Sequence, residues 1–366
     1  MNADTLGGVW TYAIELMAAL GRHDVEFVLC STGRLPTADQ RQAVVALGNV
    51  RLRESAFKLE WMEDPWDDVH RTRQWLLDVA AAEQPDLVHL NDYAHAAADW
   101  SQPVLVVGHS CVLSWHEAVR GRPAGEEWAT YRKTVTAGLR AAHAVVAPSS
   151  AMMAALQLHY GPLQPTAVIY NGLRQAQPLP TIEKQRQVLV AGRLWDEAKN
   201  VSALMRAAKA IDVPVLVAGD SLHPDGHLSA SHNVIYLGRL TPQELSQRYA
   251  ESAIYALPAR YEPFGYTPLE AARHGCALVL GDIPSLQEIW GDAALYVPPE
   301  DEQAIADTIN DLLAHPMRLS QQAAAAQERA AKFLPDSMAS SYLTLYQQLC
   351  AATHSPDSDR KVSCVS

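Results

Sequence analysis

Short apolar runs alternate with amphipathic segments along nearly the whole chain, and this alternation most constrains the fold. The runs are continuous, as in VEFVLCS (25–31), QVLVAGR (187–193) and CALVLGD (276–282). Strands that are apolar on both faces are typical of parallel sheets that helices cover on both sides. The alternation therefore predicts doubly wound α/β domains.

The same reading places strands and helices in both halves of the chain. Strands are expected at 25–31, 49–55, 86–92, 103–110, 142–149, 166–172, 187–193, 214–220, 234–240, 252–259 and 276–282. Amphipathic helices are expected at 9–20, 199–210, 301–314 and 318–333, with a late helix over about 336–350.

The length of 366 residues favours two domains, since a domain typically has ~150 residues. The segment 171–187 is rich in Pro and Gln and has no apolar period, so it marks the boundary. We predict an N-terminal domain over 1–172 and a C-terminal domain over 173–335. A helix over 336–352 would cross back to the first domain, and the polar tail over 353–366 would be disordered.

The start of the chain conflicts with this scheme. The Gly7-Gly8 turn and its helix should follow a buried central strand, yet only MNADTL precedes them. The sequence thus predicts that the first strand is missing, either because the start is misassigned or shortened, or because another segment fills its place.

Charge and cysteine content exclude several classes of protein. The formal net charge is -12, which argues against a nucleic-acid binder. It also argues against docking on an anionic membrane unless charge is segregated between the domains, so peripheral membrane contact stays open. The five cysteines form no C-x-x-C pair, and no signal peptide or run of ~18 apolar residues occurs. These features favour a reducing cytoplasm, and no pattern indicates the oligomeric state.

One polar segment, RYEPFGYTPLEAARHG (260–275), follows an expected strand and opens a helix. Thr267-Pro268-Leu269-Glu270 fits a capping box, which would give Glu270 a structural role without any ligand. Glu262 precedes the helix, where it is either a ligand contact or a solvated loop carboxylate. The amides of Phe264, Gly265 and Tyr266 approach the helix N-terminus, a place that favours an anion.

A second polar segment, AGRLWDEAKN (191–200), links an expected strand to a helix. Arg193 and Lys199 lie six residues apart and could clamp a diphosphate between them. Asp196 and Glu197 stand between the two cations and could instead neutralise both.

Together these segments resemble the donor-site signature of the retaining glycosyltransferases of family 4. The resemblance spans roughly 5–335 and includes Gly7-Gly8, the loop HSCVLSWH, VIYNGL and VIYLGRL. It implies the GT-B fold, an α/β architecture of two facing Rossmann-like domains with a cleft between them. It also implies a nucleotide-sugar donor (UDP, GDP or ADP), an acceptor hydroxyl and transfer with retention.

The resemblance implies a role for each matching residue. Arg193 and Lys199 would hold the diphosphate, Glu262 would touch the transferred sugar, and Glu270 would accept hydrogen bonds from the ribose. His109 would sit close to the reacting sugar, although it could equally be a structural histidine. The remaining donor-site positions are Phe264, Gly265, Tyr266 and Thr267 near the phosphates, Leu240 at the base, and Gly7 and Gly8 in the glycine loop.

The chemistry of these residues agrees with such roles. Expulsion of a diphosphate must be stabilised, and two cations with a helix N-terminus could do so without a metal or other cofactor. The one D-x-D pattern, Asp357-Ser358-Asp359, lies in the polar tail and is given no metal role. Rival interpretations are another GT-B enzyme, such as a nucleotide-sugar epimerase or a phosphorylase, and a non-catalytic two-lobed sugar-binding protein.

Overall fold

A computed structural model describes residues 1–174, 182–219 and 234–353. The chain divides into two compact units. Unit 1 comprises Met1–Ser114, Ala124–Gly172 and the segment from Pro335 onward, and unit 2 comprises Trp115–Pro123 and Leu173–Leu334. The short segment Trp115–Pro123 therefore groups with unit 2, within the stretch that the sequence assigns to the N-terminal domain. The predicted disordered tail lies, from residue 354 on, outside the described residues.

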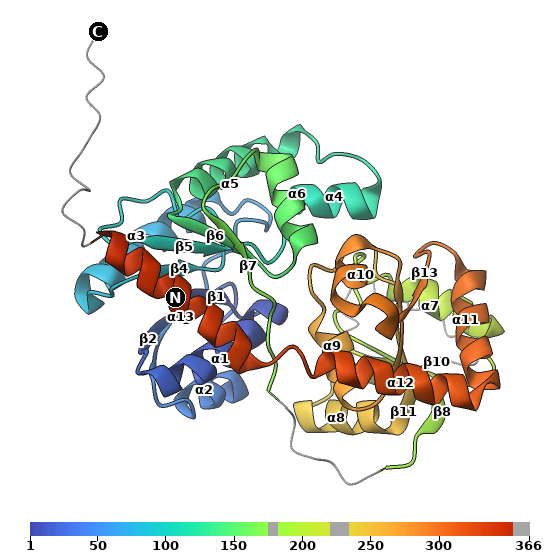
Figure 1. The fold of residues 1–366 in the computed structure, drawn as a ribbon. Coiled ribbons are helices and arrows are strands. Elements are labelled where there is room, and N and C mark those ends of the chain that lie inside the picture. The colour runs from blue at the N-terminus through green and yellow to red at the C-terminus, as the bar shows by residue number, and fades with distance from the viewer. Residues whose placement is uncertain (175–181, 220–233, 354–366) are drawn as a thin grey trace. The chain divides into compact units, whose positions relative to one another are not determined.

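Unit 1 is built on parallel strands in two sheets (Figure 1). One sheet has the order β1-β2-β3 and the other the order β4-β5-β6-β7. The strands are β1 (Asn2–Asp4), β2 (Phe27–Thr32), β3 (Val50–Glu54), β4 (Val88–Leu90), β5 (Val104–Val107), β6 (Ala144–Ala147) and β7 (Thr166–Val168).

The side chain of Asn2 joins the two sheets of unit 1. Its Oδ1 accepts from the backbone N–H of Asn91, at 2.8 Å, and its backbone carbonyl accepts from Asn91 Nδ2 at 2.7 Å. Because β1 and β4 pack side by side here, the seven strands follow the order 3-2-1-4-5-6-7. This is the doubly wound arrangement with β1 at the centre.

The expectation of a missing first strand is wrong. Asn2, Ala3 and Asp4 pair in parallel with Cys30, Ser31 and Thr32 of β2. The strand escapes notice because it is three residues long and two of its residues are polar. Asn2 is buried, and its hydrogen bonds offset the free-energy cost of burying a polar side chain.

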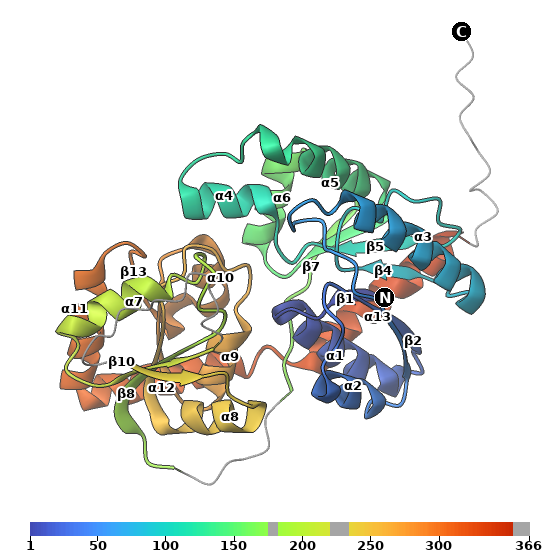
Figure 2. The same ribbon diagram turned by 180° about the vertical axis from the view of Figure 1, so that it is seen from behind.

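Helices cover the strands of unit 1 (Figures 1 and 2). They are α1 (Gly8–Leu20), α2 (Ala38–Val45), α3 (Trp66–Glu83), the start of α4 (Val112–Arg120), α5 (Ala129–Ala141), α6 (Ser150–Tyr160) and α13 (Pro335–Thr353). Helix α13, red in Figure 1, packs against α1 although the two are far apart in sequence. Tyr342 of α13 is fully buried, with its ring 5.9 Å from that of Tyr12.

Unit 2 holds a six-stranded parallel sheet of order β10-β9-β8-β11-β12-β13. Its strands are β8 (Gln185–Ala191), β9 (Val215–Ala218), β10 (Val234–Gly238), β11 (Ser252–Leu257), β12 (Ala277–Gly281) and β13 (Leu295–Val297). Its helices are α7 (Val201–Ala207), α8 (Pro242–Glu251), α9 (Tyr266–Arg273), α10 (Pro284–Trp290), α11 (Glu302–Ala314) and α12 (Pro316–Ala330). The core includes every residue of β11 and the fully buried Trp290.

The predicted strands are confirmed, since each expected range overlaps one strand of the structure. Most observed strands are shorter than expected, whereas β2 ends one residue later and β8 begins two residues earlier. Besides β1, strand β13 was not predicted; it is a three-residue edge strand in which Leu295 and Tyr296 are partly exposed and Val297 is buried. Both omissions are short strands without a continuous apolar run.

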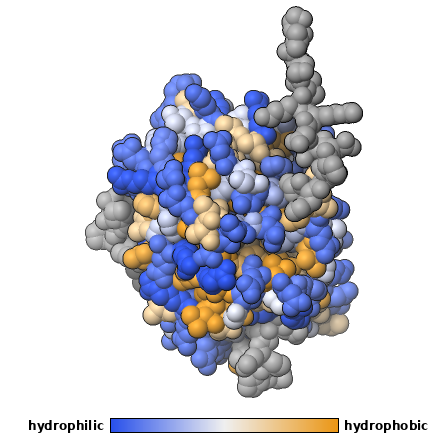
Figure 3. Space-filling model, turned by 90° about the vertical axis from the view of Figure 1, so that its left-hand side faces the viewer, coloured by the Kyte–Doolittle hydropathy of each residue, from blue (hydrophilic) through white to orange (hydrophobic). Residues whose placement is uncertain are grey.

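Polar and apolar residues are mixed on the face drawn in Figure 3, where hydrophilic residues (blue) predominate. Among the described residues, no helix combines the length and the apolar character needed to span a membrane.

Helix α5 approaches the loop after β4 closely at Gly138. A Cβ atom added to Gly138 would lie 1.9 Å from the backbone oxygen of Tyr93. That loop carries Asn91 and Asp92, which bond to Asn2. Glycine at this helical position therefore lets α5 pack against the centre of unit 1.

We expect Gly138→Ala to destabilise unit 1 by at least about 1–3 kcal/mol, because the clash outweighs the gain in helix propensity of about 1 kcal/mol. Thermal unfolding measured by circular dichroism tests this. Ala137→Ser, at the exposed neighbouring position, is the matched control and should change stability by no more than about 0.5 kcal/mol. Equal melting temperatures for Gly138→Ala and the control would contradict the close approach.

Candidate functional site

In unit 2 the turn between β8 and α7 carries both predicted cations. Hydrogen bonds from Asp196 N to Arg193 O (3.1 Å) and from Lys199 N to Asp196 O (2.9 Å) fold this turn. Arg193 pairs with Asp196 at 2.8 Å and lies over the ring of Trp195, 5.5 Å from its centroid. The predicted neutralisation of Arg193 by Asp196 is thus present.

Lys199 pairs with Glu262, not with Glu197. The ammonium and the carboxylate are mostly buried, with side-chain exposures of 18% and 12%. Glu262 Oε1 also accepts from the backbone N–H of Phe264 at 3.3 Å. The structure therefore joins the two predicted segments through one ion pair at the carboxyl end of the unit 2 sheet, where open α/β sheets bind ligands.

The predicted capping box at Thr267 is wrong. Helix α9 begins at Tyr266, and its N-cap is Gly265, whose φ of 94° lies in the left-handed region that suits glycine. Thr267 Oγ1 instead accepts from the hydroxyl of Tyr255 at 2.7 Å. Burial raises the pKa of Tyr255, so its phenol keeps the proton that it donates.

Because the N-cap of α9 is Gly265, Glu270 does not occupy the third helical position, which the predicted capping box requires. Its Oε2 accepts from the hydroxyl of Tyr249 at 3.1 Å. Desolvation raises the pKa of Tyr249 well above its usual range, so this tyrosine also remains a donor. Because Tyr249 is buried, this contact orients the Glu270 carboxylate from the side of the core.

The other predicted donor-site residues of unit 2 lie at the same edge of the sheet. Phe264 is buried and packs against Tyr266 and Phe333 with ring centroids 5.6 Å apart in both pairs. Leu240 is partly buried after β10, directly before the N-cap Thr241 of α8. Leu240 is not joined to the Lys199–Glu262 pair by any contact in the described part of the chain.

Sequence reasoning missed several side chains that hold this site in place. Ser285 Oγ donates to the backbone oxygen of Glu262 at 2.6 Å. Asn200, buried and in the left-handed region at φ 52°, donates to Pro258 O at 3.0 Å and Pro299 O at 2.7 Å. An asparagine directly before a helix was the available signal for such a turn.

In unit 1, the glycine loop leads from β1 into α1. Gly7 is the N-cap of α1 with φ 82° and ψ -140°, a conformation that requires glycine, and both Gly7 and Gly8 are exposed. Thr5 Oγ1 donates to Arg34 O at 2.8 Å, which anchors the loop next to the end of β2.

His109 follows β5 in unit 1 and is partly exposed. Its Nε2 lies 2.8 Å from Asn91 Oδ1, and its ring packs edge-on against Tyr12 with centroids 4.5 Å apart. Desolvation lowers the pKa of His109 to about 3, so its imidazole is neutral near pH 7.

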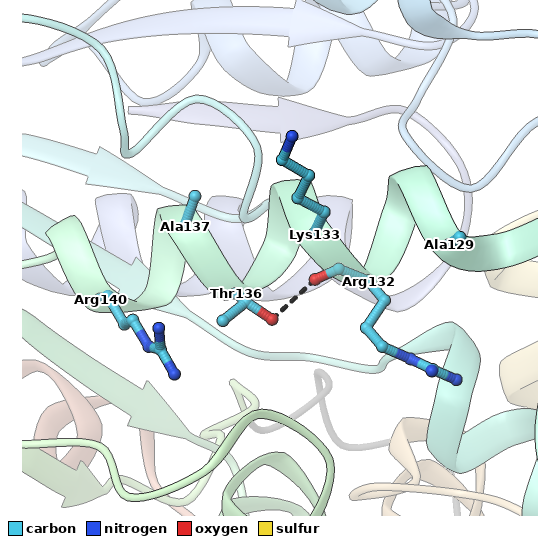
Figure 4. Close-up of a pocket in the computed structure, with 6 residues that line it drawn as sticks. All are labelled: Ala129, Arg132, Lys133, Thr136, Ala137 and Arg140. Carbon is cyan, nitrogen blue, oxygen red and sulfur yellow. Dashed lines mark hydrogen bonds between the residues drawn. The ribbon is translucent and has the colours of Figure 1, made fainter.

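A separate hollow lies on α5 of unit 1 (Figure 4). Its lining includes the exposed cations Arg132, Lys133 and Arg140, and none of the three forms an ion pair within the described residues. Charge is therefore unevenly distributed in this acidic protein, with a local cationic face on α5. None of the predicted site residues lines this hollow.

In the described part of the chain, no three His, Cys, Asp or Glu side chains gather into a group that could hold a metal ion. The D-x-D pattern at 357–359 lies outside the described residues.

Curated relatives of this chain include two bacterial proteins. The chain is 25% identical to the O-antigen chain mannosyltransferase RfbU of Salmonella typhimurium over 40% of this chain and 44% of that protein. It is 28% identical to a glycogen synthase of Mycobacterium tuberculosis over 67% of this chain and 64% of that protein. The aligned region thus spans less than two thirds of the length of these relatives.

Solved structures share the fold across nearly the whole chain. Sucrose-phosphate synthase from Thermosynechococcus elongatus aligns with a TM-score of 0.79 at 21% identity, covering 96% of both chains. Anabaena HepE in complex with UDP-glucose aligns with a TM-score of 0.73 at 19% identity, covering 95% of this chain and 100% of that chain. At these identities the likeness establishes the fold.

Two family profiles match consecutive parts of the chain. The profile for glycosyltransferase family 4 matches residues 6–176, and the profile for glycosyl transferases group 1 matches residues 185–315. The first match covers strands β2 to β7 of unit 1, and the second contains Arg193, Lys199, Glu262 and Glu270. The chain therefore belongs to the glycosyltransferases of family 4 and group 1, which have the GT-B fold.

Proposed function

We propose that this protein transfers a sugar from a nucleotide-sugar donor to an acceptor hydroxyl, with retention of configuration and without a metal ion. The observation that carries the proposal is the Lys199–Glu262 pair at the carboxyl end of the unit 2 sheet, next to the start of α9. It brings a cation for the diphosphate and a carboxylate for sugar hydroxyls into direct contact.

Stabilisation of the leaving diphosphate is assigned to Arg193 and Lys199. Glycosyl transfer builds negative charge on the diphosphate as the bond to the sugar breaks, and fixed cations lower the energy of that state. The amides that open α9 add partial positive charge at the same edge. These groups together form the metal-free leaving-group site that we propose.

Hydroxyl recognition is assigned to Glu262 and Glu270. A carboxylate accepts hydrogen bonds only, and is therefore suited to sugar and ribose hydroxyls. Glu262 would bind the transferred sugar, and Glu270, oriented by Tyr249, would bind the ribose. Because neither acts as a covalent nucleophile in this scheme, departure and attack on one face of the sugar account for retention.

The donor would carry UDP, GDP or ADP as its nucleotide. The HepE structure contains UDP-glucose, which favours UDP as the first candidate for this chain. The acceptor would bind at the segments around 56–70 and 111–126, where the sequence places Trp61, Trp66 and Trp115.

We expect one nucleoside diphosphate to raise the melting temperature of the full chain in a thermal-shift screen of UDP, GDP and ADP. A ligand that binds only the folded state adds about 2.7 kcal/mol of stability at a hundredfold excess over its Kd. The matching monophosphate is the control and should give a smaller shift, because it lacks the second phosphate. If no diphosphate or nucleotide sugar shifts the melting temperature, the transferase proposal fails.

Substitutions at the ion pair should separate binding from turnover. Lys199→Ala and Arg193→Ala should weaken binding of the diphosphate and lower kcat/KM on the order of 10²–10³-fold. Glu262→Ala should also abolish most turnover, yet it should bind the free nucleoside diphosphate at least as tightly, since Lys199 loses a competing carboxylate. Calorimetric titration and a transfer assay measure the two effects.

Arg206→Ala is the matched control for these variants, because Arg206 on α7 forms an exposed pair with Glu302. It should leave binding and turnover within about twofold, as exposed ion pairs contribute little. Wild-type turnover in all three site variants would disprove the assignment of the site.

Metal independence gives a separate expectation. We expect transfer to persist when the protein is assayed in excess EDTA after chelator treatment, because the cations of the site belong to the chain. The control is the same assay with added Mg²⁺ or Mn²⁺. Loss of activity in EDTA with full recovery on adding metal would overturn the metal-free scheme.

A further inference from the structure

A chain of partly buried polar contacts leads from the centre of the unit 1 sheet to His109. Asn2 accepts from the backbone N–H of Asn91, Asn91 bonds back to Asn2, and Asn91 Oδ1 faces His109 Nε2. All three residues belong to unit 1: Asn2 opens β1, Asn91 directly follows β4, and His109 lies just after the end of β5.

The orientation of the Asn91 amide follows from its partner. Asn91 Nδ2 lies 2.7 Å from the backbone oxygen of Asn2, which can only accept a hydrogen bond. The NH₂ group must therefore face Asn2, and the Oδ1 atom must face His109. A flipped amide would place two oxygens against each other.

The orientation of Asn91 in turn decides the proton position on His109. Since Asn91 Oδ1 can only accept, His109 Nε2, at 2.8 Å, must carry the hydrogen. A neutral imidazole has one N–H, so Nδ1 then holds a lone pair. Within the described residues, Nδ1 has no hydrogen-bond partner of its own.

Packing against Tyr12 also fixes the orientation of the His109 ring. The aromatic ring of Tyr12 on α1 packs edge-on against the His109 ring. The hydroxyl of Tyr12 lies 3.3 Å from His89 Nε2, and His89 Nδ1 lies 2.6 Å from the hydroxyl of Tyr346 on α13. Rotation of the His109 ring would break the Asn91 bond and disturb this packing.

We propose that Asn91, itself oriented by Asn2, is a positioning residue that holds His109 in the tautomer with the proton on Nε2 and the lone pair on Nδ1. In this form His109 offers the substrate a hydrogen-bond acceptor and not a proton donor. Such a group recognises a hydroxyl and disfavours an anionic phosphate oxygen. The recognition of a substrate hydroxyl rests on the proposed transferase function, whereas the tautomer itself does not.

Nuclear magnetic resonance of the full chain labelled with [¹⁵N]histidine tests the tautomer without any substrate. His109→Gln identifies the His109 ring signals by their loss. We expect wild-type His109 to show a protonated Nε2 and an unprotonated Nδ1 at neutral pH. Asn91→Ala should give a mixture of tautomers.

Asn49→Ala is the matched control, because the Asn49 amide also donates to backbone carbonyls of unit 1, at 3.0 Å from Met17 O and 2.9 Å from Val25 O. It should leave the His109 signals unchanged. A proton on Nδ1 in the wild type, or an unchanged spectrum in folded Asn91→Ala, would overturn the proposal.

Asn91→Asp serves as a second variant of nearly the same shape, should Asn91→Ala not fold. The carboxylate still accepts from Nε2 but stabilises the charged imidazolium, so His109 should titrate at a higher pH than in the wild type. An unchanged titration of His109 in this variant would contradict the contact.

Turnover links the tautomer to the reaction. With a donor that the thermal-shift screen identifies, Asn91→Ala should lower kcat/KM about tenfold, the effect of one hydrogen bond, and Asn49→Ala should not. A single Nε2-protonated tautomer in a protein that binds no nucleotide would leave the positioning role intact and refute only the transferase function.

Discussion

Coverage of both sheets by helices confines the polar chemistry of this protein to the ends of strands. Parallel strands that are apolar on both faces leave no room for charged side chains along their length. The buried residues of β5, β6 and β11 are aliphatic, alanine, serine or tyrosine. Arg193, Lys199 and Glu262 in unit 2 and Asn91 and His109 in unit 1 all follow strands, where backbone groups and loops can satisfy them.

Asn2 is one polar residue that lies within a strand of unit 1, and it joins the two sheets of that unit. It is a polar residue inside the central strand, and its side chain replaces backbone ladder bonds between β1 and β4. An unsatisfied amide at this depth would cost a few kcal/mol, but each polar end of Asn2 finds a partner. The residue that joins the sheet is thus the same one that orients Asn91 and, through it, His109.

Continuous apolar runs were sufficient to predict the parallel sheets, and they failed at β1 and β13, which have no such run. Residue type and spacing singled out the two polar segments that contain Lys199 and Glu262, and the resemblance to family 4 supplied their expected roles. The capping box at Thr267 failed because a distant residue, Tyr255, binds the threonine hydroxyl, and Gly265 can start the helix earlier. The sequence around Thr267 indicates neither the hydrogen bond from Tyr255 nor the start of the helix after Gly265. The hydrogen bonds from Asn2 to Asn91 and from Asn91 to His109 connect residues of three different strands or their ends. They can be predicted only once the order and register of those strands are known.

The ion pairs of unit 2 have a consequence for how a donor would bind. Lys199 is neutralised by Glu262 and Arg193 by Asp196, so these four side chains together add little net charge to the site. A diphosphate alone would draw Lys199 away and leave the mostly buried Glu262 carboxylate without a cation. A sugar attached to that diphosphate offers its hydroxyls to Glu262 at the same moment. In the proposed transferase, the pairing would therefore favour an intact nucleotide sugar over its diphosphate product, and this difference would assist product release after transfer.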